Sequence, residues 1–243
     1  MVVIRSQGQI IFGNFSLPRE RAPCVILSHG LESSKDSDKW LLLSSQLCDA
    51  GFASLRFNYR GCGEGEEKSE GEFEDTSLAG RISDYRAAID YLQTVRIDTK
   101  RLGAIGSSFG GMVALAAKDK RIKAMVTLAT PYLLPSPSED ALEHAKDQGY
   151  LELNSGRRLR LGFYQDLRRY NILTEIKKIR CPLLIIHGGK DEIVPVEHAH
   201  VLYRHANEPK RLEIIDGANH VFDNPKHLDI VVRLSLEWFK TYP

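Results

Sequence analysis

The sequence predicts an α/β fold, with a mostly parallel sheet, an antiparallel hairpin at its N-terminal end and helices on both faces. Two observations lead to this fold class. After Pro23, short and wholly apolar segments alternate with longer segments of helical period. Before Pro23, apolar and polar side chains alternate on both sides of a Gln7-Gly8 break. Apolar runs of this length suit strands buried on both faces of a sheet, and parallel strands require crossover helices.

The expected strands share an apolar character and a length of a few residues. In chain order they are 2–5, 9–17, 25–27, 53–57, 102–105, 124–128, 183–186 and 212–215. The first two are joined too tightly to be parallel, so they form the hairpin. In such sheets, ligands bind outside the carboxyl ends of the strands, and we look for function there.

Amphipathic helices are expected between these strands. Ile82, Tyr85, Ile89 and Leu92 recur at three- and four-residue steps, which places them on one helical face. A similar stripe runs from residue 228 to residue 239, and residues 112–118 favour a helix. We interpret residues 1–243 as a single domain.

One segment, from Pro131 to Thr174, is too long for an ordinary connection between elements. It has helical patterns of its own at 139–148 and 163–170. Long insertions at the active edge of a sheet are often lids, so we expect a small cap at about 131–174. Its aromatic and leucine side chains either line an apolar pocket or pack the cap onto the body.

Composition excludes several classes of protein. The chain has 243 residues, 42% hydrophobic and 27% charged, with a formal net charge of +1. These values are typical of a globular protein and give no global attraction to nucleic acid or anionic lipid. The N-terminus lacks the pattern of a secretory signal, and the apolar runs are too short to cross a bilayer. Four scattered cysteines without a CxxC pair indicate reduced thiols. We therefore expect a cytoplasmic protein without nucleic-acid or membrane partners, either a monomer or a homodimer.

The strongest chemical signal is Gly106-Ser107-Ser108-Phe109-Gly110, between a predicted strand and a predicted helix. G-x-S-x-G in this context is a nucleophile elbow. The turn is so tight that a Cβ atom at Gly106 or Gly110 would collide with backbone, and Ser108 is held in a strained conformation. The alternative is a Gly/Ser-rich turn without chemistry.

A serine hydroxyl needs a base, and the base needs a carboxylate that orients it. Among the eight histidines, His220 lies in a loop just after the last predicted strand. His187 abuts its strand and is expected to brace the following turn, and His144 lies in the insertion. Asp191 follows the strand 183–186, and the order Ser, Asp, His is the expected chain order. The competing acids are Glu192, Asp216 and Asp223.

Acyl transfer also needs donors that face the developing negative charge. The backbone N–H of Phe109, next to Ser108, is the first candidate. The loop Ser28-His29-Gly30-Leu31-Glu32 should supply the second, with Gly30 permitting a turn that directs the Leu31 amide inward. The alternative is an ordinary glycine at a strand end.

Together, His29-Gly30, Asn58-Tyr59-Arg60-Gly61, the elbow, Gly189-Lys190-Asp191 and Asn219-His220 resemble the α/β-hydrolase superfamily. The resemblance is greatest to small serine esterases of the cinnamoyl/feruloyl type, and to dienelactone-hydrolase-like and serine-aminopeptidase-like relatives. It implies Ser108, Asp191 and His220 as a triad, Leu31 and Phe109 as oxyanion donors, and no cofactor or metal. Two departures are the serine, where dienelactone hydrolases use cysteine, and Cys62, where many relatives have histidine.

The predicted function is the hydrolysis of small-molecule carboxylic esters with short to medium acyl or aryl-acyl chains. An amidase or aminopeptidase and a non-catalytic ligand-binding protein remain the alternatives. The insertion carries an arginine cluster, Arg157, Arg158, Arg160, Arg168 and Arg169. We interpret it as a solvated helix face, with a site for a substrate carboxylate as the alternative. Pairing with the acidic loop 64–75 is a hypothesis.

Overall fold

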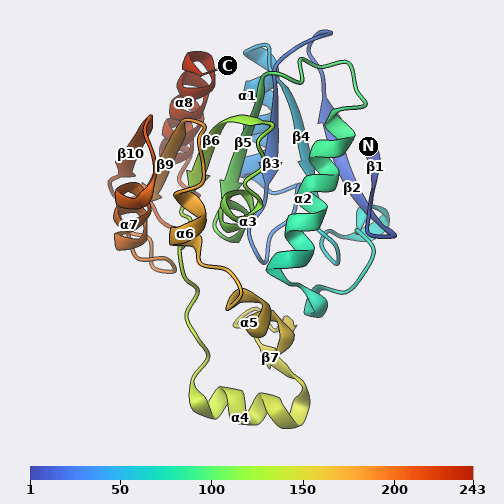
Figure 1. Cartoon of the computed structure of the whole chain (residues 1–243), viewed down its shortest axis with the longest axis vertical. Helices are drawn as coiled ribbons and strands as arrows, with labels where there is room; N and C mark the ends of the chain where they lie inside the picture. Colours follow the sequence, from blue (N-terminus) through green and yellow to red (C-terminus); the bar gives the residue numbers. More distant parts are fainter. Residues whose placement is uncertain (243) are drawn as a thin grey trace.

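The computed structural model describes residues 1–242, except the side chain of His144. Within that range, eight strands form one sheet in the order β1-β2-β4-β3-β5-β6-β9-β10. The strands of this sheet are β1 (Val2–Ser6), β2 (Gln9–Ser16), β3 (Cys24–Ser28), β4 (Ala53–Phe57), β5 (Leu102–Ser107), β6 (Ile122–Leu128), β9 (Leu183–Gly188) and β10 (Lys210–Ile215). The first two pairings, β1 with β2 and β2 with β4, are antiparallel, and all others are parallel. The predicted fold class is therefore confirmed (Figure 1).

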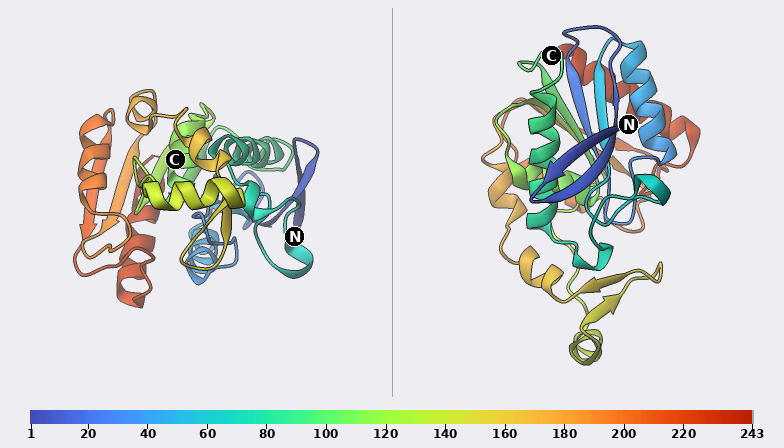
Figure 2. Two further views of the ribbon diagram at one scale, coloured as in Figure 1. Left: turned by 90° about the horizontal axis from the view of Figure 1, so that it is seen from below. Right: turned by 90° about the vertical axis from the view of Figure 1, so that its right-hand side faces the viewer.

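Helices cover both faces of the sheet (Figure 2). The helices of the described chain are α1 (Asp38–Asp49), α2 (Leu78–Leu92), α3 (Phe109–Ala117), α4 (Glu139–Gln148), α5 (Gly162–Leu167), α6 (Ile172–Ile176), α7 (Glu197–His205) and α8 (Pro225–Thr241). The buried side chains of α1 and α8 form one apolar core, and those of α2, α3, α6 and α7 belong to another core across the sheet.

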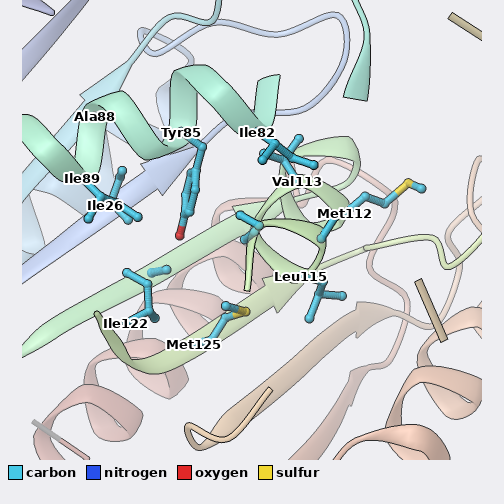
Figure 3. Packing of buried hydrophobic residues seen from close by; sticks show 14 of the residues in the cluster. Ile26, Ile82, Tyr85, Ala88, Ile89, Met112, Val113, Leu115, Ile122 and Met125 are labelled. Atoms are coloured by element: carbon cyan, nitrogen blue, oxygen red, sulfur yellow. The ribbon is translucent and has the colours of Figure 1, made fainter. Parts of the chain in front are cut away.

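The core under α2 explains why that helix forms where the sequence places it. Ile82, Tyr85 and Ile89 face the sheet and pack with Val113 of α3 and Ile26 of β3 (Figure 3). Ser77 caps the helix by accepting a hydrogen bond from the Gly80 N–H at 3.0 Å. Burial of this apolar stripe fixes the rotation of α2 about its axis, and therefore which of its polar residues point toward the sheet edge.

The segment from residue 131 to residue 174 leaves the sheet after β6 and returns before β9. It contains α4, α5, the first turn of α6 and a two-stranded antiparallel hairpin, β7 (Tyr150–Glu152) and β8 (Arg158–Arg160). Figure 1 shows α4, β7 and α5 set apart from the main body. The helix predicted at 139–148 has those bounds, the one predicted at 163–170 ends at Leu167, and the hairpin was not predicted.

Two short 3₁₀ helices lie in the acidic loop between β4 and α2. They are η1 (Gly65–Glu67) and η2 (Phe73–Asp75). In the structure the loop contacts the 131–174 segment through Arg160, which forms ion pairs with Glu74 and, at 2.7 Å, with Asp75. One arginine of the cluster therefore pairs with this loop.

No helix within residues 1–242 has the length and apolar character needed to span a bilayer.

Candidate active site

The turn from β5 into α3 has the strained geometry predicted for it. Ser108 adopts φ 53° and ψ −122°, in the left-handed half of the Ramachandran plot where non-glycine residues are rare. Its N–H donates to Leu128 O at 2.8 Å, which ties the turn to the neighbouring strand β6. A Cβ atom at Gly106 would lie 2.6 Å from Gly111 Cα, and one at Gly110 would lie 2.5 Å from His29 O. The turn therefore requires glycine at both positions for steric reasons.

Three side chains from separate strand ends meet at this turn. His220, in the loop after β10, has its Nε2 3.1 Å from Ser108 Oγ. Its Nδ1 is 2.8 Å from Oδ2 of Asp191, in the loop after β9. When the Nδ1 proton is donated to Asp191, Nε2 is free to accept the serine proton. The structure thus brings the three predicted residues into one hydrogen-bonded chain.

The Asp191 side chain is fully buried, accepts three hydrogen bonds and has a fourth N–H group nearby. Oδ1 accepts the backbone N–H groups of Ile193 at 2.9 Å and Val194 at 2.8 Å, and Oδ2 lies 3.2 Å from His187 Nε2 as well as near His220. Burial by itself raises the pKa of Asp191, but the hydrogen bonds from His187, His220 and Val194 outweigh burial and hold the pKa well below its usual value. Asp191 is therefore a fixed negative charge.

The competing acids point elsewhere. Glu192 and Asp216 are exposed, and Asp223 accepts a hydrogen bond from Asn219 Nδ2 at 2.8 Å. His187 has its Nε2 2.8 Å from Val194 O, so it braces the turn after β9, as expected. The strand runs through His187 to Gly188, two residues beyond the predicted end.

The amides of Leu31 and Phe109 are unpaired. Within residues 1–242, neither N–H donates to a backbone or side-chain acceptor. Phe109 is the first residue of α3, so its N–H points out of the N-terminal end of the helix. The loop that carries Leu31 passes beside Ser108, because a Cβ atom built on Gly30 would lie 3.5 Å from Ser108 Cβ. Two free donors therefore flank the nucleophile elbow.

The conformational reason predicted for Gly30 is wrong. The φ angle of Gly30 lies outside the left-handed region, and an added Cβ would make only ordinary contacts, 3.5 Å from Ser107 O. That Cβ would instead occupy space next to Ser108. The absence of a side chain at residue 30 leaves room beside the hydroxyl and is not needed for the turn itself.

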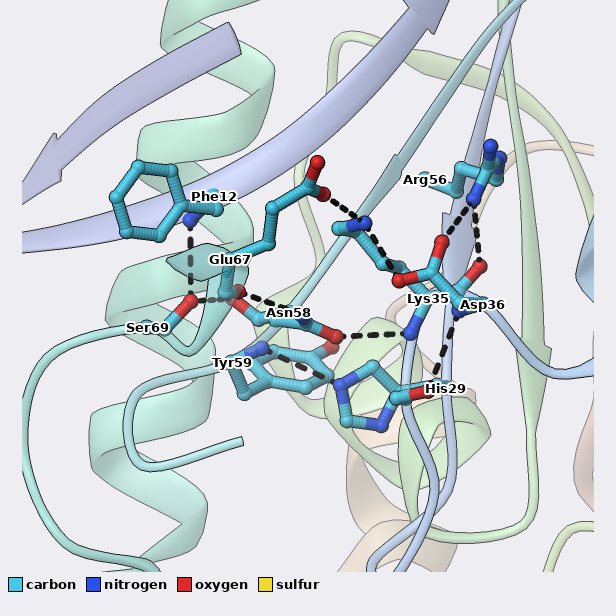
Figure 4. A network of polar contacts seen from close by, with 10 residues as sticks. Phe12, His29, Lys35, Asp36, Arg56, Asn58, Tyr59, Glu67 and Ser69 are labelled. Atoms are coloured by element: carbon cyan, nitrogen blue, oxygen red, sulfur yellow. Dashed lines mark hydrogen bonds and ion pairs between the residues drawn. The ribbon is translucent and has the colours of Figure 1, made fainter. Parts of the chain in front are cut away.

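The loop after β3 is held by polar contacts with the loop after β4 (Figure 4). His29 Nε2 accepts the Tyr59 N–H at 3.3 Å, so the ring proton is on Nδ1, which donates to Gly30 O at 2.8 Å. Asn58 Oδ1 accepts the Lys35 N–H at 2.8 Å. Burial, with a smaller effect of the Arg81 charge, lowers the pKa of His29 to about 3. A neutral His29 thus fixes the Gly30 carbonyl.

Two cations near the site were not anticipated from the sequence. Lys39, at the start of α1, donates from Nζ to Ser107 Oγ at 2.8 Å, and burial lowers its pKa to about 8. Arg81 of α2 reaches the carbonyls of Gly30 and Leu31 and also Cys62. Cys62 is fully buried beside the Arg81 side chain.

A family model described as the prolyl oligopeptidase family (Peptidase_S9) matches residues 41–243. The chain belongs to this family. It is a serine hydrolase with the α/β-hydrolase fold.

Relatives and a solved structure are similar to this chain over most of its length. An uncharacterized protein of Mycobacterium tuberculosis is 30% identical over 232 residues, which cover 94% of this chain and 74% of the relative. The esterase candidate YitV of Bacillus subtilis is 28% identical, over 92% of this chain and 91% of its own. Est1E from Butyrivibrio proteoclasticus, solved with ferulic acid, has a TM-score of 0.88 and 24% identity, covering 100% of this chain and 99% of its own. At this identity the last similarity shows the fold alone.

Proposed function

We propose that the protein is a serine carboxylesterase that hydrolyses small esters through an acyl-enzyme intermediate. The observation that carries this proposal is the chain of hydrogen bonds from Ser108 Oγ to His220 at 3.1 Å and on to Asp191 at 2.8 Å. A hydroxyl, an imidazole and a buried carboxylate in this order activate a serine for attack on a carbonyl.

In the proposed mechanism, His220 Nε2 takes the Ser108 proton as Oγ attacks the ester carbonyl. The anionic oxygen that forms is bound by the amides of Leu31 and Phe109, whose N–H groups have no acceptor within the described part of the chain. His220, paired with the Asp191 charge, then gives the proton to the leaving alcohol. Water attacks the acyl enzyme by the same route in reverse and releases the acid. No step requires a cofactor or metal.

An apolar pocket supports a substrate with an apolar or aromatic acyl group. It has a volume of about 370 Å³ and lies between the 131–174 segment and Met112, one helical turn beyond Ser108. Tyr132, Leu134 and Tyr164 line it, among others. A second hollow, of about 470 Å³, lies between α1 and α8. Neither hollow is lined by a triad residue or an oxyanion donor, but only the first borders α3, the helix that begins directly after Ser108. We therefore assign the acyl group to the first pocket and propose that the 131–174 segment acts as a cap.

Exposed apolar side chains next to the triad support the same substrate class. Ile193, two residues after Asp191, is 64% exposed, and Val221, directly after His220, is 50% exposed. Leu133, in the proposed cap, is 62% exposed and lines the pocket assigned to the acyl group. Within the arginine cluster, only Arg168 lines the pocket.

Labelling with a fluorophosphonate probe tests the proposal, because such probes modify only activated serines. We expect one adduct, located at Ser108, and loss of ester turnover by roughly 10⁴-fold or more in S108A. D191N should also lose about 10⁴-fold at neutral pH. S107A is the matched control, since it removes the adjacent hydroxyl, and it should keep the label. Labelling at another residue would refute the assignment of the nucleophile.

Amide hydrolysis is the second candidate, because the family that the chain belongs to is named for peptidases. Comparing nitrophenyl esters with amino-acid anilides separates the two. We expect esters to be cleaved far faster, and faster cleavage of anilides would favour an aminopeptidase. If neither class is turned over and Ser108 stays unlabelled, the result would favour the alternative of a non-catalytic ligand-binding protein.

A further inference from the structure

Arg81 is a buried cation for which the proposed mechanism has no role. Its side chain is 1% exposed, and no carboxylate of residues 1–242 forms an ion pair with it. Asp84, one helical turn further along α2, pairs instead with Arg60 at 2.6 Å. A buried charge without a counter-ion is costly unless polar groups surround it. The groups that Arg81 contacts therefore indicate why it is there.

The guanidinium group binds two successive carbonyls of the loop after β3. Nη1 donates to Gly30 O at 3.0 Å, and Nη2 donates to Leu31 O at 2.8 Å. Gly30 O also accepts from His29 Nδ1, so two side chains hold one carbonyl. In a trans peptide the C=O of Gly30 and the N–H of Leu31 point in opposite directions. Holding that carbonyl on the Arg81 side therefore directs the Leu31 N–H away from Arg81.

The same guanidinium group packs against the residue that supplies the other amide. It lies 5.2 Å from the ring centroid of Phe109 and 4.8 Å from that of Tyr59. One side chain from α2 thus touches both residues that carry the free amides. The positive charge also polarises the peptide between Gly30 and Leu31, which makes its N–H a stronger donor.

We propose that Arg81 is a positioning residue for the oxyanion hole. It orients and polarises the Leu31 amide from behind and does not contact the substrate. This inference rests on the proposed function, because it concerns the donors used in that mechanism.

The test compares R81M with R86M by steady-state ester hydrolysis. Arg86 lies on the same helix, and its Nη2 also donates to a backbone carbonyl, Ala117 O at 2.9 Å, but away from the site. We expect R81M to lower kcat about 30- to 100-fold with little change in KM, because losing one oxyanion donor costs about 10²- to 10³-fold. R86M should remain within about twofold of the original protein.

Inhibitors provide a readout that a merely structural role would not affect. A trifluoromethyl ketone forms an oxyanion with Ser108, whereas the product alcohol is neutral and places no negative charge in the oxyanion hole. R81M should weaken the binding of the trifluoromethyl ketone by a factor similar to the loss in kcat and leave the affinity for the product alcohol unchanged. Equal weakening of both would overturn the proposal.

R81K makes the test independent of whether R81M folds. Lysine keeps the charge but cannot bind both carbonyls as a fork, so kcat should fall about tenfold at an unchanged Tm. Unchanged kcat in a folded R81K or R81M would overturn the role of Arg81. Absence of ester turnover and of Ser108 labelling in the original protein would instead refute the proposed function.

Discussion

At the scale of single residues, two buried histidines hold the loops of the site. His29 connects the loop after β3 to Tyr59, and His187 connects the turn after β9 to Val194. Both are fully buried, and both bind backbone groups. His29 uses both ring nitrogens, whereas Nδ1 of His187 has no hydrogen-bond partner among the described residues. A neutral imidazole, with one donor and one acceptor nitrogen, therefore suits the role of His29.

His29 should make stability depend on pH. Burial, assisted by the Arg81 charge, lowers its pKa from 6.5 to about 3 in the folded protein. As the pH falls below 6.5, the unfolded chain binds a proton that the folded protein does not. Stability that is complete above pH 6.5 is therefore lost between pH 6.5 and pH 3, by up to about 1.4 kcal/mol per pH unit. Urea denaturation at pH 4 to 7 should show a shallower slope for H29N than for the original protein.

The control for this prediction is H200N, which changes an exposed histidine of α7. H200N should show the same dependence of unfolding free energy on pH as the original protein. Identical slopes for H29N and the original protein would contradict the assignment to His29.

The triad could be predicted from the sequence because its residues lie in recognisable motifs. The role of Arg81 could not, because it depends on how helix α2 is buried. Ser108, Asp191 and His220 follow strand ends in a recognisable order, and the structure places them within hydrogen-bond distance. Arg81 lies next to Ile82 in an amphipathic helix, where an arginine is usually solvated. Only the docking of α2 shows that residue 81 faces the loop after β3. Its position one residue before the apolar stripe was the available signal.

At the scale of elements, the acidic loop attaches the hairpin β7–β8 to the body. Arg157 lies 3.4 Å from the ring centroid of Phe73, and Arg160 pairs with Glu74 and Asp75 of η2. Arg158 contacts Tyr150 and Glu152, which belong to its own hairpin. The contacts of Arg157 and Arg160 therefore attach the hairpin to the body, whereas those of Arg158 stabilise the hairpin internally.

Removing the attachment should loosen the hairpin without unfolding the sheet. We expect R157A/R160A to raise hydrogen exchange in β7–β8 while the amides of β5 stay protected. R158A is the matched control and should not detach the hairpin. Because exposed ion pairs are screened by salt, high ionic strength should mimic part of the effect of the double variant. Unchanged exchange in the double variant would show that other contacts hold the hairpin.

The hairpin β7–β8 was not predicted because its sequence has no strong period. Each strand of the hairpin has only three residues, which are too few to show an alternation of apolar and polar side chains. Helix α1 did have a signal that was overlooked, since Trp40, Leu43 and Leu47 recur at helical spacing and are buried. Several predicted strands ended up to two residues too early or began up to two residues too late. Backbone pairing between strands continues beyond the apolar run of each strand.

At the scale of the whole molecule, the two cores meet at the central strand β5. Gly103 faces α8, where a Cβ atom would lie 2.5 Å from Phe239 Cε1. The last helix therefore packs closely on the strand that carries the nucleophile elbow. Glycine is needed there because of the aromatic ring and not because of the backbone.

G103A should accordingly destabilise the protein by about 1–3 kcal/mol through overpacking. F239L, which shortens the side chain opposite, should relieve much of that cost, so the double variant should be more stable than the sum of the single effects predicts. Urea denaturation of the four proteins measures this coupling. Strict additivity would show that the ring moves aside freely.

The site is also assembled from widely separated parts of the chain. The elbow strand β5 pairs with β3 and β6, whereas the loop that carries His220 comes after β10, which pairs only with β9 at the edge of the sheet. During synthesis on the ribosome, residue 108 emerges more than a hundred residues before residue 220. A nascent chain therefore contains its serine long before the imidazole that activates it, and it stays chemically silent until residue 220 has also emerged and the loops after β9 and β10 have reached the elbow.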